Sequence, residues 1–447
     1  MTLYRLLPSL FALSVFLGMT LLYLFGDRTM YTFVLQSYGV RPYDFPFVDF
    51  QNSLAAWQCA REGVDVISGN PCDPLNRGYT YGPIWLAFSF IPLDIADTGW
   101  LGWLLGFCFL SSFVFLPATK RPWELALMTL ACISTMVVFA VERANADIIV
   151  FMVAAAIGYL ATLRRFPAYA LIIAAGLFKY YPITMLILAV RERLRVLFAI
   201  IAIAFCIGVL FISAYYNDLQ RGVPLIAIGS YFDDLFAAKD LPFGFVEIAP
   251  WFVSPSIGQN GTAWLVYAFL GLEALLVCFA LVRKNLVPTL SWTERDQVFL
   301  VIGCALIVGC FFAGQSIGYR GIAFLFALPG FLALARKSRT VAQKRVTLFT
   351  SGAILFLMWE EFFRWHLVKN LIDAFSASSE TTFLSIYFFW IGRELVWWWV
   401  ITVMAAILVR FVLTSQAVSA FVTQCKILLT AMQIRLRRRA FRPPAQP

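Results

Sequence analysis

The chain has 447 residues, of which 61% are hydrophobic and only 13% are Asp, Glu, Lys or Arg. An ordinary soluble domain carries about 25% charged residues. A soluble protein of this length could not remove so much apolar surface from water, so soluble, disordered and fibrous classes are excluded. The net charge of +10 would suggest nucleic acid in a soluble protein. In a chain this apolar, the positions of the charged residues along the sequence decide how the net charge is interpreted.

Apolar segments recur along the whole chain. A membrane-spanning helix needs about 20 mostly apolar residues. In lipid only helices and closed barrels satisfy the backbone, and these runs are continuous rather than alternating, which favours helices. The sequence therefore predicts an all-α polytopic membrane protein of about 11–13 transmembrane helices. The candidate segments are 8–26, 82–93, 99–117, 123–141, 147–163, 167–178, 181–190, 196–215, 263–282, 297–313, 320–335, 345–359 and 382–411.

Positively charged residues set the predicted topology. Alternating crossings place the Lys/Arg clusters on one side, together with both termini, and the positive-inside rule makes that side cytoplasmic. Residues 82–117 must then make one net crossing, so 82–93 is expected to be re-entrant or to lie along the interface. The clusters also suit anionic lipid, so no nucleic-acid partner is expected. They are Lys120-Arg121, Arg164-Arg165, Arg191 to Arg195, Arg283-Lys284, Arg336 to Arg345 and Arg435 to Arg439.

The domain organisation is simple. Residues 1–26 lack a clear cleavage site and are predicted to be an uncleaved first helix. We expect one multi-helix domain over 1–434, with outer segments 27–81, 216–262 and 360–381, and a basic cytoplasmic tail over 435–447. The localisation that fits is a bacterial inner membrane, with the active face toward the periplasm.

Two cysteines stand apart from the others. Cys59 and Cys72 both lie in the first outer segment, whereas the other cysteines lie in apolar segments where a thiol is usually a small hydrophobic group. On an oxidising outer side, a Cys59–Cys72 disulfide is expected. Two cysteines without a local histidine are too few for zinc. We expect neither a metal nor a cofactor, and no nucleotide-binding loop is present.

Ionisable residues next to apolar segments are the functional candidates, because a charge at membrane depth is costly. Asp49, between Phe47-Val48 and Phe50, is partly desolvated, which suits a general base. The alternative interpretation is a helix cap or surface acid, and Asp44 is a weaker candidate for the same role. In the turn-rich segment 70–83, Arg77 and Tyr81 are candidate substrate contacts, or only loop structure.

Three further outer turns carry cations. Arg143 and Asn145 lie in a tight connector, suited to a phosphate and a hydroxyl respectively, unless Arg143 simply pairs with Glu142. The other candidates are Lys179 with Tyr180, and Arg320 with Tyr319, each of which could instead lie at the membrane interface. A last group looks like an interfacial aromatic belt with charges, and His366 is its candidate site residue. This group is Trp359 to His366 with Arg393-Glu394 before Trp397 to Trp399.

Together these outer residues resemble the GT-C superfamily of integral-membrane glycosyltransferases, most closely glycosyltransferase family 87. The likeness covers about residues 40–340. The matching features are Asp49 after the first helix, Tyr81-Gly82-Pro83, Arg143-Ala144-Asn145, Gly176 to Pro182 followed by Arg191, and Tyr319-Arg320 before an apolar helix. Two motifs depart from the family pattern. The family often has Tyr-Pro-Pro at Tyr81-Gly82-Pro83, and Gly-Gln-x-Asn at Glu142 to Asn145.

The resemblance implies transfer of a hexose or pentose from a polyprenyl-phosphate donor to a glycan or glycolipid acceptor on the outer face, with inversion. Asp49 would deprotonate the acceptor hydroxyl, and Arg143, Lys179 and Arg320 would bind the donor phosphate. The substrate contacts would be Asp44, Arg77, Tyr81, Asn145, Tyr180, Tyr319 and His366.

Two other functions stay open. A transporter or flippase of lipid-linked sugars would share the helices and the phosphate ligands, and Glu273 inside an apolar segment favours it. Transporters often carry internal repeats, and none is seen here. A polymerase or ligase of lipid-linked glycans would also transfer sugar on the outer face.

Overall fold

The structure, a computed structural model, describes residues 2–67, 69–226, 229–232, 234–248, 259–288, 295–371 and 379–424. The predicted basic tail over 435–447 therefore lies outside the described residues. So do parts of the second and third outer segments, at 227–228, 233, 249–258 and 372–378.

The described chain is almost entirely helical, as predicted. The short 3-10 helices are η1 (Pro83–Phe88), η2 (Ile95–Asp97), η3 (Ser112–Phe115), η4 (Tyr181–Arg191), η5 (Val223–Leu225) and η7 (Gly318–Ala323), and η8 (Arg364–Leu371) is a π-helix. The α-helices are α1 (Thr2–Phe25), α2 (Arg28–Ser37), α3 (Val48–Arg61), α4 (Thr98–Ser111), α5 (Pro122–Cys132), α6 (Thr135–Arg143), α7 (Ala146–Leu163), α8 (Arg165–Phe178), α9 (Leu194–Ala214), α10 (Tyr216–Gly222), α11 (Asp240–Ile248), α12 (Gln259–Arg283), α13 (Arg295–Ala313), α14 (Phe324–Lys337), α15 (Val341–Met358), α16 (Glu360–Phe363) and α18 (Ser379–Leu413).

Nine helical stretches in the described residues are long and apolar enough to cross a membrane, or ten if the bent pair of α15 with α16 and the following turn counts as one. The predicted segment 82–93 does not span: it forms only the six-residue η1. Helices α8 and η4 are shorter apolar pieces. They pack against each other, and Arg165 at the start of one pairs with Glu192 after the other, 3.3 Å apart. The predicted rise and return around Lys179 is therefore present.

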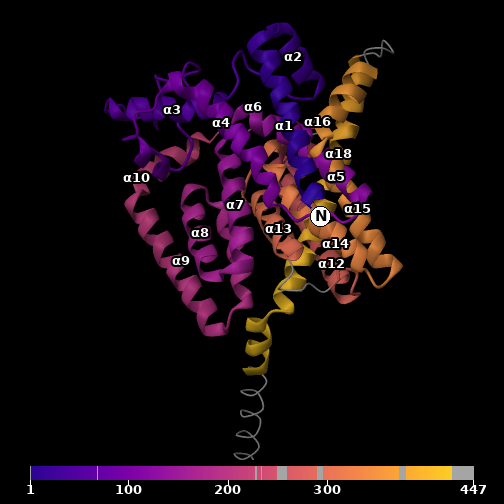
Figure 1. The fold of residues 1–447 in the computed structure, drawn as a ribbon. Coiled ribbons are helices and arrows are strands. Elements are labelled where there is room, and N and C mark those ends of the chain that lie inside the picture. The colour runs from indigo at the N-terminus through magenta and orange to yellow at the C-terminus, as the bar shows by residue number, and fades with distance from the viewer. Residues whose placement is uncertain are drawn as a thin grey trace, which may run out of the picture.

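The helices divide into a buried centre and an apolar periphery. In α14, 94% of the span's residues are buried, and in α13, 72%. By contrast, only 6% are buried in α9 and 11% in α12, although both are strongly apolar. Figure 1 shows α7, α8 and α9 side by side, with α2, α3 and α10 gathered toward one end of the bundle. An exposed apolar surface of this extent is expected to face lipid.

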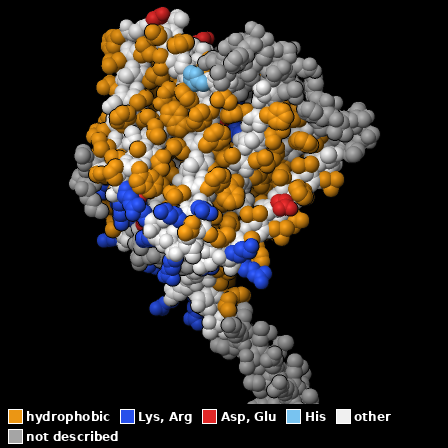
Figure 2. Space-filling view, turned by 90° about the vertical axis from the view of Figure 1, so that its right-hand side faces the viewer, with side chains coloured by type: hydrophobic (Ala, Val, Ile, Leu, Met, Phe, Trp, Pro, Cys, Tyr) orange, Lys and Arg blue, Asp and Glu red, His pale blue; other side chains and the backbone are white. Residues whose placement is uncertain are grey.

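Charge is distributed unevenly along the bundle. On the face drawn in Figure 2, hydrophobic side chains form a broad band and Lys and Arg gather below it, while acids are visible at the top and at the lower right of the band. The gathering of Lys and Arg at one end agrees with the predicted basic side. The ion pair between Arg336 and Glu124 lies among the basic clusters, and joins α14 to α5.

Two irregular features shape the part of the bundle around η7 and α16. The pair of two-residue strands β1 (Leu235–Phe236) and β2 (Ser316–Ile317) is antiparallel, with Leu235 opposite Ile317. This ladder holds the segment before α11 against the turn that begins η7. The second feature is a 64° bend between α15 and α16, which turns the chain at Glu360.

Candidate functional site

Asp49 lies in the first turn of α3, two residues after Phe47, whose conformation sets where the helix begins. Phe47 caps the helix with φ at 66°, a left-handed conformation that non-glycine residues rarely adopt. Two contacts hold it there. Its amide donates to the Glu142 carbonyl at 2.6 Å, and its ring packs edge-on against Trp103 with centroids 4.6 Å apart. The start of α3 is therefore fixed against α6 and α4.

Asn145 connects Asp49 to two tyrosines. Its amide nitrogen lies 2.8 Å from Asp49 Oδ2, 2.9 Å from the Tyr81 hydroxyl and 2.6 Å from the Tyr319 hydroxyl. The Tyr319 hydroxyl also reaches Asp49 Oδ2 at 3.4 Å. Asn145 is the N-cap of α7 and only 4% exposed. The cap therefore fixes an amide nitrogen that donates its two hydrogens among the Asp49 carboxylate and the two tyrosine hydroxyls.

The same asparagine leads to a buried cationic group. Lys179 Nζ donates to Asn145 Oδ1 at 3.0 Å and pairs with Asp147 at 2.8 Å. Arg320 pairs with the other oxygen of Asp147 at 3.3 Å, and the Tyr181 hydroxyl also donates to this carboxylate. Asp147 is 2% exposed. Two cations thus share one buried carboxylate, which leaves a surplus positive charge beside Asn145.

Arg77 approaches Asp49 from the opposite side. Its Nη1 lies 3.6 Å from Asp49 Oδ1, and its Nη2 donates to the Val48 carbonyl at 2.7 Å. The guanidinium is held by Asp73 through contacts of 2.9 Å. Burial acts to raise the pKa of Asp73, but hydrogen bonds and charge from Arg77 outweigh it, so the pKa lies below its ordinary value.

A disulfide fastens this loop to α3. Cys59 and Cys72 are bonded in the structure, at a sequence separation of 13. The bond ties the loop to the last turn of α3, and Arg77 reaches the first turn of the same helix through its hydrogen bond to the Val48 carbonyl.

Tyr81 completes the site from the same loop. Burial, and then the charge of Asp49, raise the pKa of Tyr81 well above its usual range, so its hydroxyl stays protonated. Trp85 donates to the Phe178 carbonyl at 3.1 Å, which ties η1 to the residue before Lys179. A side chain at Gly82 would approach that same carbonyl to 3.2 Å. The close approach suits glycine here.

The structure brings together seven of the residues named from sequence and leaves four outside. Asp44 is exposed. Arg143 pairs with Glu142, stacks on the Tyr43 ring at 4.3 Å and donates to the Arg41 carbonyl, so its described contacts lie outside the network. Of the remaining two, Tyr180 is 55% exposed and His366 contacts the Ser37 carbonyl at 2.7 Å. The joined residues are Asp49, Arg77, Tyr81, Asn145, Lys179, Tyr319 and Arg320.

Two interpretations of the residues change. Phe47 packs against Trp103, and the described contacts of Asp49 are with polar groups rather than with this flanking aromatic residue. The sequence alone gives Asp147 no role, although it is the acid that holds both cations. The signal that marks it is an ionisable side chain at the start of the apolar helix α7.

The charges of the site suit an anionic group beside a base. Side-chain exposures of 19% for Asp49, 9% for Lys179 and 19% for Arg320 show that each is partly accessible. Asp49 lies 3.6 Å from Arg77, whereas Asp73 and Asp147 hold their cations at 2.9 Å and 2.8 Å, so Asp49 has the loosest ion pair of the three carboxylates. Comparisons with protein-family models, curated proteins and solved structures return no match to this chain.

Proposed function

We propose that the chain is an inverting membrane glycosyltransferase that uses a polyprenyl-phosphate-linked hexose or pentose as donor. The acceptor is a glycan or glycolipid on the outer face. The observation that supports this most is the juxtaposition of Asp49 with the Lys179–Asp147–Arg320 group through one residue, Asn145. A base and a phosphate-binding charge stand next to each other, as glycosyl transfer from a lipid phosphate requires.

The division of labour follows from charge. Asp49 accepts the proton of the acceptor hydroxyl as that oxygen attacks the anomeric carbon, and the lipid phosphate leaves with the bonding electrons. Lys179 and Arg320 supply a single net positive charge after Asp147 is counted, which stabilises the departing phosphate. Arg143 is not needed in this account, because its guanidinium is committed to Glu142 and Tyr43.

The orientation rests on the same bundle. The basic end is proposed to be cytoplasmic, and the end with Asp49 periplasmic in a bacterial inner membrane. The lipid chain of the donor would lie against an exposed apolar helix. A phosphate already attached to the lipid is a good leaving group, so the proposal requires no nucleotide site and no resident metal at Asp49.

A transporter of lipid-linked sugars receives less support. Glu273, the acid that favoured it, is exposed on α12, where only 11% of the span is buried. A transporter site is expected near the midplane between packed helices. Polymerisation or ligation of lipid-linked glycans remains a variant of the same chemistry with a longer donor.

The decisive experiment compares two acids of the first outer segment. A strain that lacks the protein is complemented with Asp49→Asn or Asp44→Asn, and its lipid-linked glycans are analysed by mass spectrometry. The expected result is a glycan that lacks one sugar in the deletion strain, restored by Asp44→Asn. Asp49→Asn should restore it poorly, because removal of a general base costs about 10²–10⁴-fold in rate.

The outcomes separate the functions. Full restoration by Asp49→Asn would reject the base assignment. Glycans of normal composition but altered sidedness in the deletion strain would indicate a transporter instead. Equal amounts of wild-type protein and both variants in the membrane fraction serve as the folding control.

A further inference from the structure

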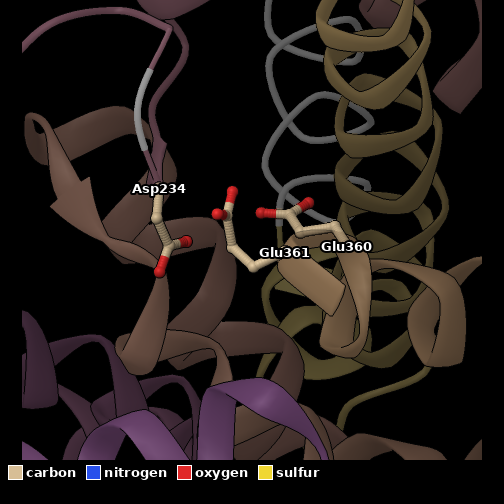
Figure 3. Close-up of side chains that lie close together, drawn as sticks. All are labelled: Asp234, Glu360 and Glu361. Carbon is tan, nitrogen blue, oxygen red and sulfur yellow. The ribbon is translucent and has the colours of Figure 1, made fainter. Parts of the chain in front are cut away.

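A second group of acids lies next to the turn that carries Tyr319 and Arg320. One oxygen from each of Asp234, Glu360 and Glu361 lies within 4.8 Å of the others. Figure 3 shows these side chains reaching toward one another from two segments, the loop before β1 and the helix α16. Glu360 is 1% exposed and Glu361 4%. The sequence pattern predicts that the α16 acids belong to an interfacial belt, whereas the structure buries them.

The cations of this region are fewer than its acids. Arg364 takes both oxygens of Glu361. Arg393, itself 1% exposed, holds Glu394 at 2.8 Å and lies 4.0 Å from Glu360 and Glu361. Arg41 lies within electrostatic range of Asp234. Three guanidinium groups therefore face the four carboxylates of Asp234, Glu360, Glu361 and Glu394, which leaves a negative excess.

Glu360 provides a separate observation. Both of its carboxylate oxygens are buried and lack a hydrogen-bond partner in the described structure, and Oδ1 of Asp234 is in the same condition. Burial of a carboxylate without a hydrogen bond is costly. The Glu360 side chain points into the group rather than toward solvent (Figure 3).

We propose that Asp234, Glu360 and Glu361 bind one hard divalent cation, such as Ca²⁺, Mn²⁺ or Mg²⁺. Carboxylate oxygens are the ligands these ions prefer. Oxygens up to 4.8 Å apart can face each other across one ion, since Ca²⁺–oxygen distances are about 2.3–2.6 Å. Transition metals that prefer sulfur or imidazole find no such ligand in this group. The site goes beyond the sequence expectation of no metal and does not rest on the proposed glycosyl transfer.

The ion would join three parts of the outer side. Asp234 adjoins η7, because the Gly318 amide donates to its carbonyl at 2.9 Å and a side chain at Gly318 would collide with its carboxylate. Glu361 adjoins the first outer segment, since a side chain at Gly39 would come within 2.5 Å of its backbone. The cation would thus hold the turn of Tyr319 and Arg320 in place through Asp234, without contact to Asp49.

The test measures binding directly. The full-length protein in lipid nanodiscs is stripped with EDTA, and metal content and thermal stability are measured with Ca²⁺, Mn²⁺ or Mg²⁺. Tb³⁺ luminescence, sensitised by the adjacent Trp359, reports occupancy without any variant. We expect about one ion per chain and a rise of at least ~2 °C in Tm at saturating cation.

Glu360→Gln is the informative variant, and Asp65→Asn is its matched control. Asp65 is an exposed acid paired with Arg221 elsewhere on the outer side. Glu360→Gln should lose the ion, the Tm response and the Tb³⁺ signal, yet be at least as stable as wild type in EDTA because a buried repulsion is removed. Asp65→Asn should behave as wild type. Absence of ion binding and of any Tm response in the wild-type protein, or unchanged binding in Glu360→Gln, would overturn the proposal. The result of these binding measurements does not depend on whether the protein transfers sugar.

Discussion

Two charged groups adjoin η7 and are built in opposite ways. Around Asp147, one buried acid is shared by Lys179 and Arg320, and each oxygen has a partner. Around Glu360, buried acids outnumber their cations, and both oxygens of Glu360 lack hydrogen bonds. The first arrangement carries a surplus positive charge and the second a surplus negative charge. The sign of the excess charge in each group indicates whether the group can bind an anion or a cation.

The largest expected effect comes from removal of the shared acid. Asp147→Asn leaves Lys179 and Arg320 buried together without their counter-charge, so we expect a loss of about 3–5 kcal/mol in stability. Thermal unfolding in detergent measures it. The comparison variant is Glu360→Gln without divalent cation, where the same change of acid to amide should not destabilise. A loss of equal size in both variants would contradict the opposite charge balance of the two groups.

A smaller effect is expected at Asp73, which anchors Arg77. Asp73→Asn should lower stability by about 2 kcal/mol at neutral pH, because it removes charge-assisted hydrogen bonds from a partly buried guanidinium. Since the folded pKa of Asp73 is lowered, its contribution is full above its unfolded pKa of about 3.9 and is lost as pH falls below that value. Wild type and variant should therefore converge in acid. A stability difference that grows toward low pH would contradict the assignment.

The smallest expected effect separates two cations that sequence could not rank. Lys179→Ala removes the surplus charge while Asp147 keeps Arg320 and Tyr181, so stability should change little. Donor affinity should fall about tenfold, the equivalent of 1.4 kcal/mol. Arg143→Ala is the control, because its guanidinium stacks on Tyr43 outside the network. Binding of a polyprenyl-phosphate sugar in nanodiscs measures both, and equal losses would return Arg143 to the site.

Most of the membrane architecture could be predicted from sequence because length and hydropathy determine spanning helices. Arginines at both of its ends predict the hairpin of α8 and η4. The parity of the crossings predicts that 82–93 does not span the membrane by itself. The 64° bend before Glu360 and the ladder of Leu235 with Ile317 could not be predicted. Both depend on packing between distant segments, and neither has a periodic signal.

The site was partly predictable for a related reason. Asp49, Lys179 and Arg320 each interrupt an apolar context, and that cost marks them. Arg143 also interrupts an apolar context, yet it lies outside the network. Ala144 lies between Arg143 and Asn145 in a left-handed conformation, with φ at 46°, which turns the chain between the two residues. Sequence spacing contains no information on that turn. The partnership of Asp147 with both cations likewise depends on three helices meeting.

The short β1–β2 ladder has a mechanical consequence. Its two strands leave the segment before α11 and the start of η7 hydrogen-bonded to each other, with Asp234 immediately before one strand and Gly318 immediately after the other. A displacement of the segment before α11 would therefore be transmitted to the turn that carries Tyr319 and Arg320.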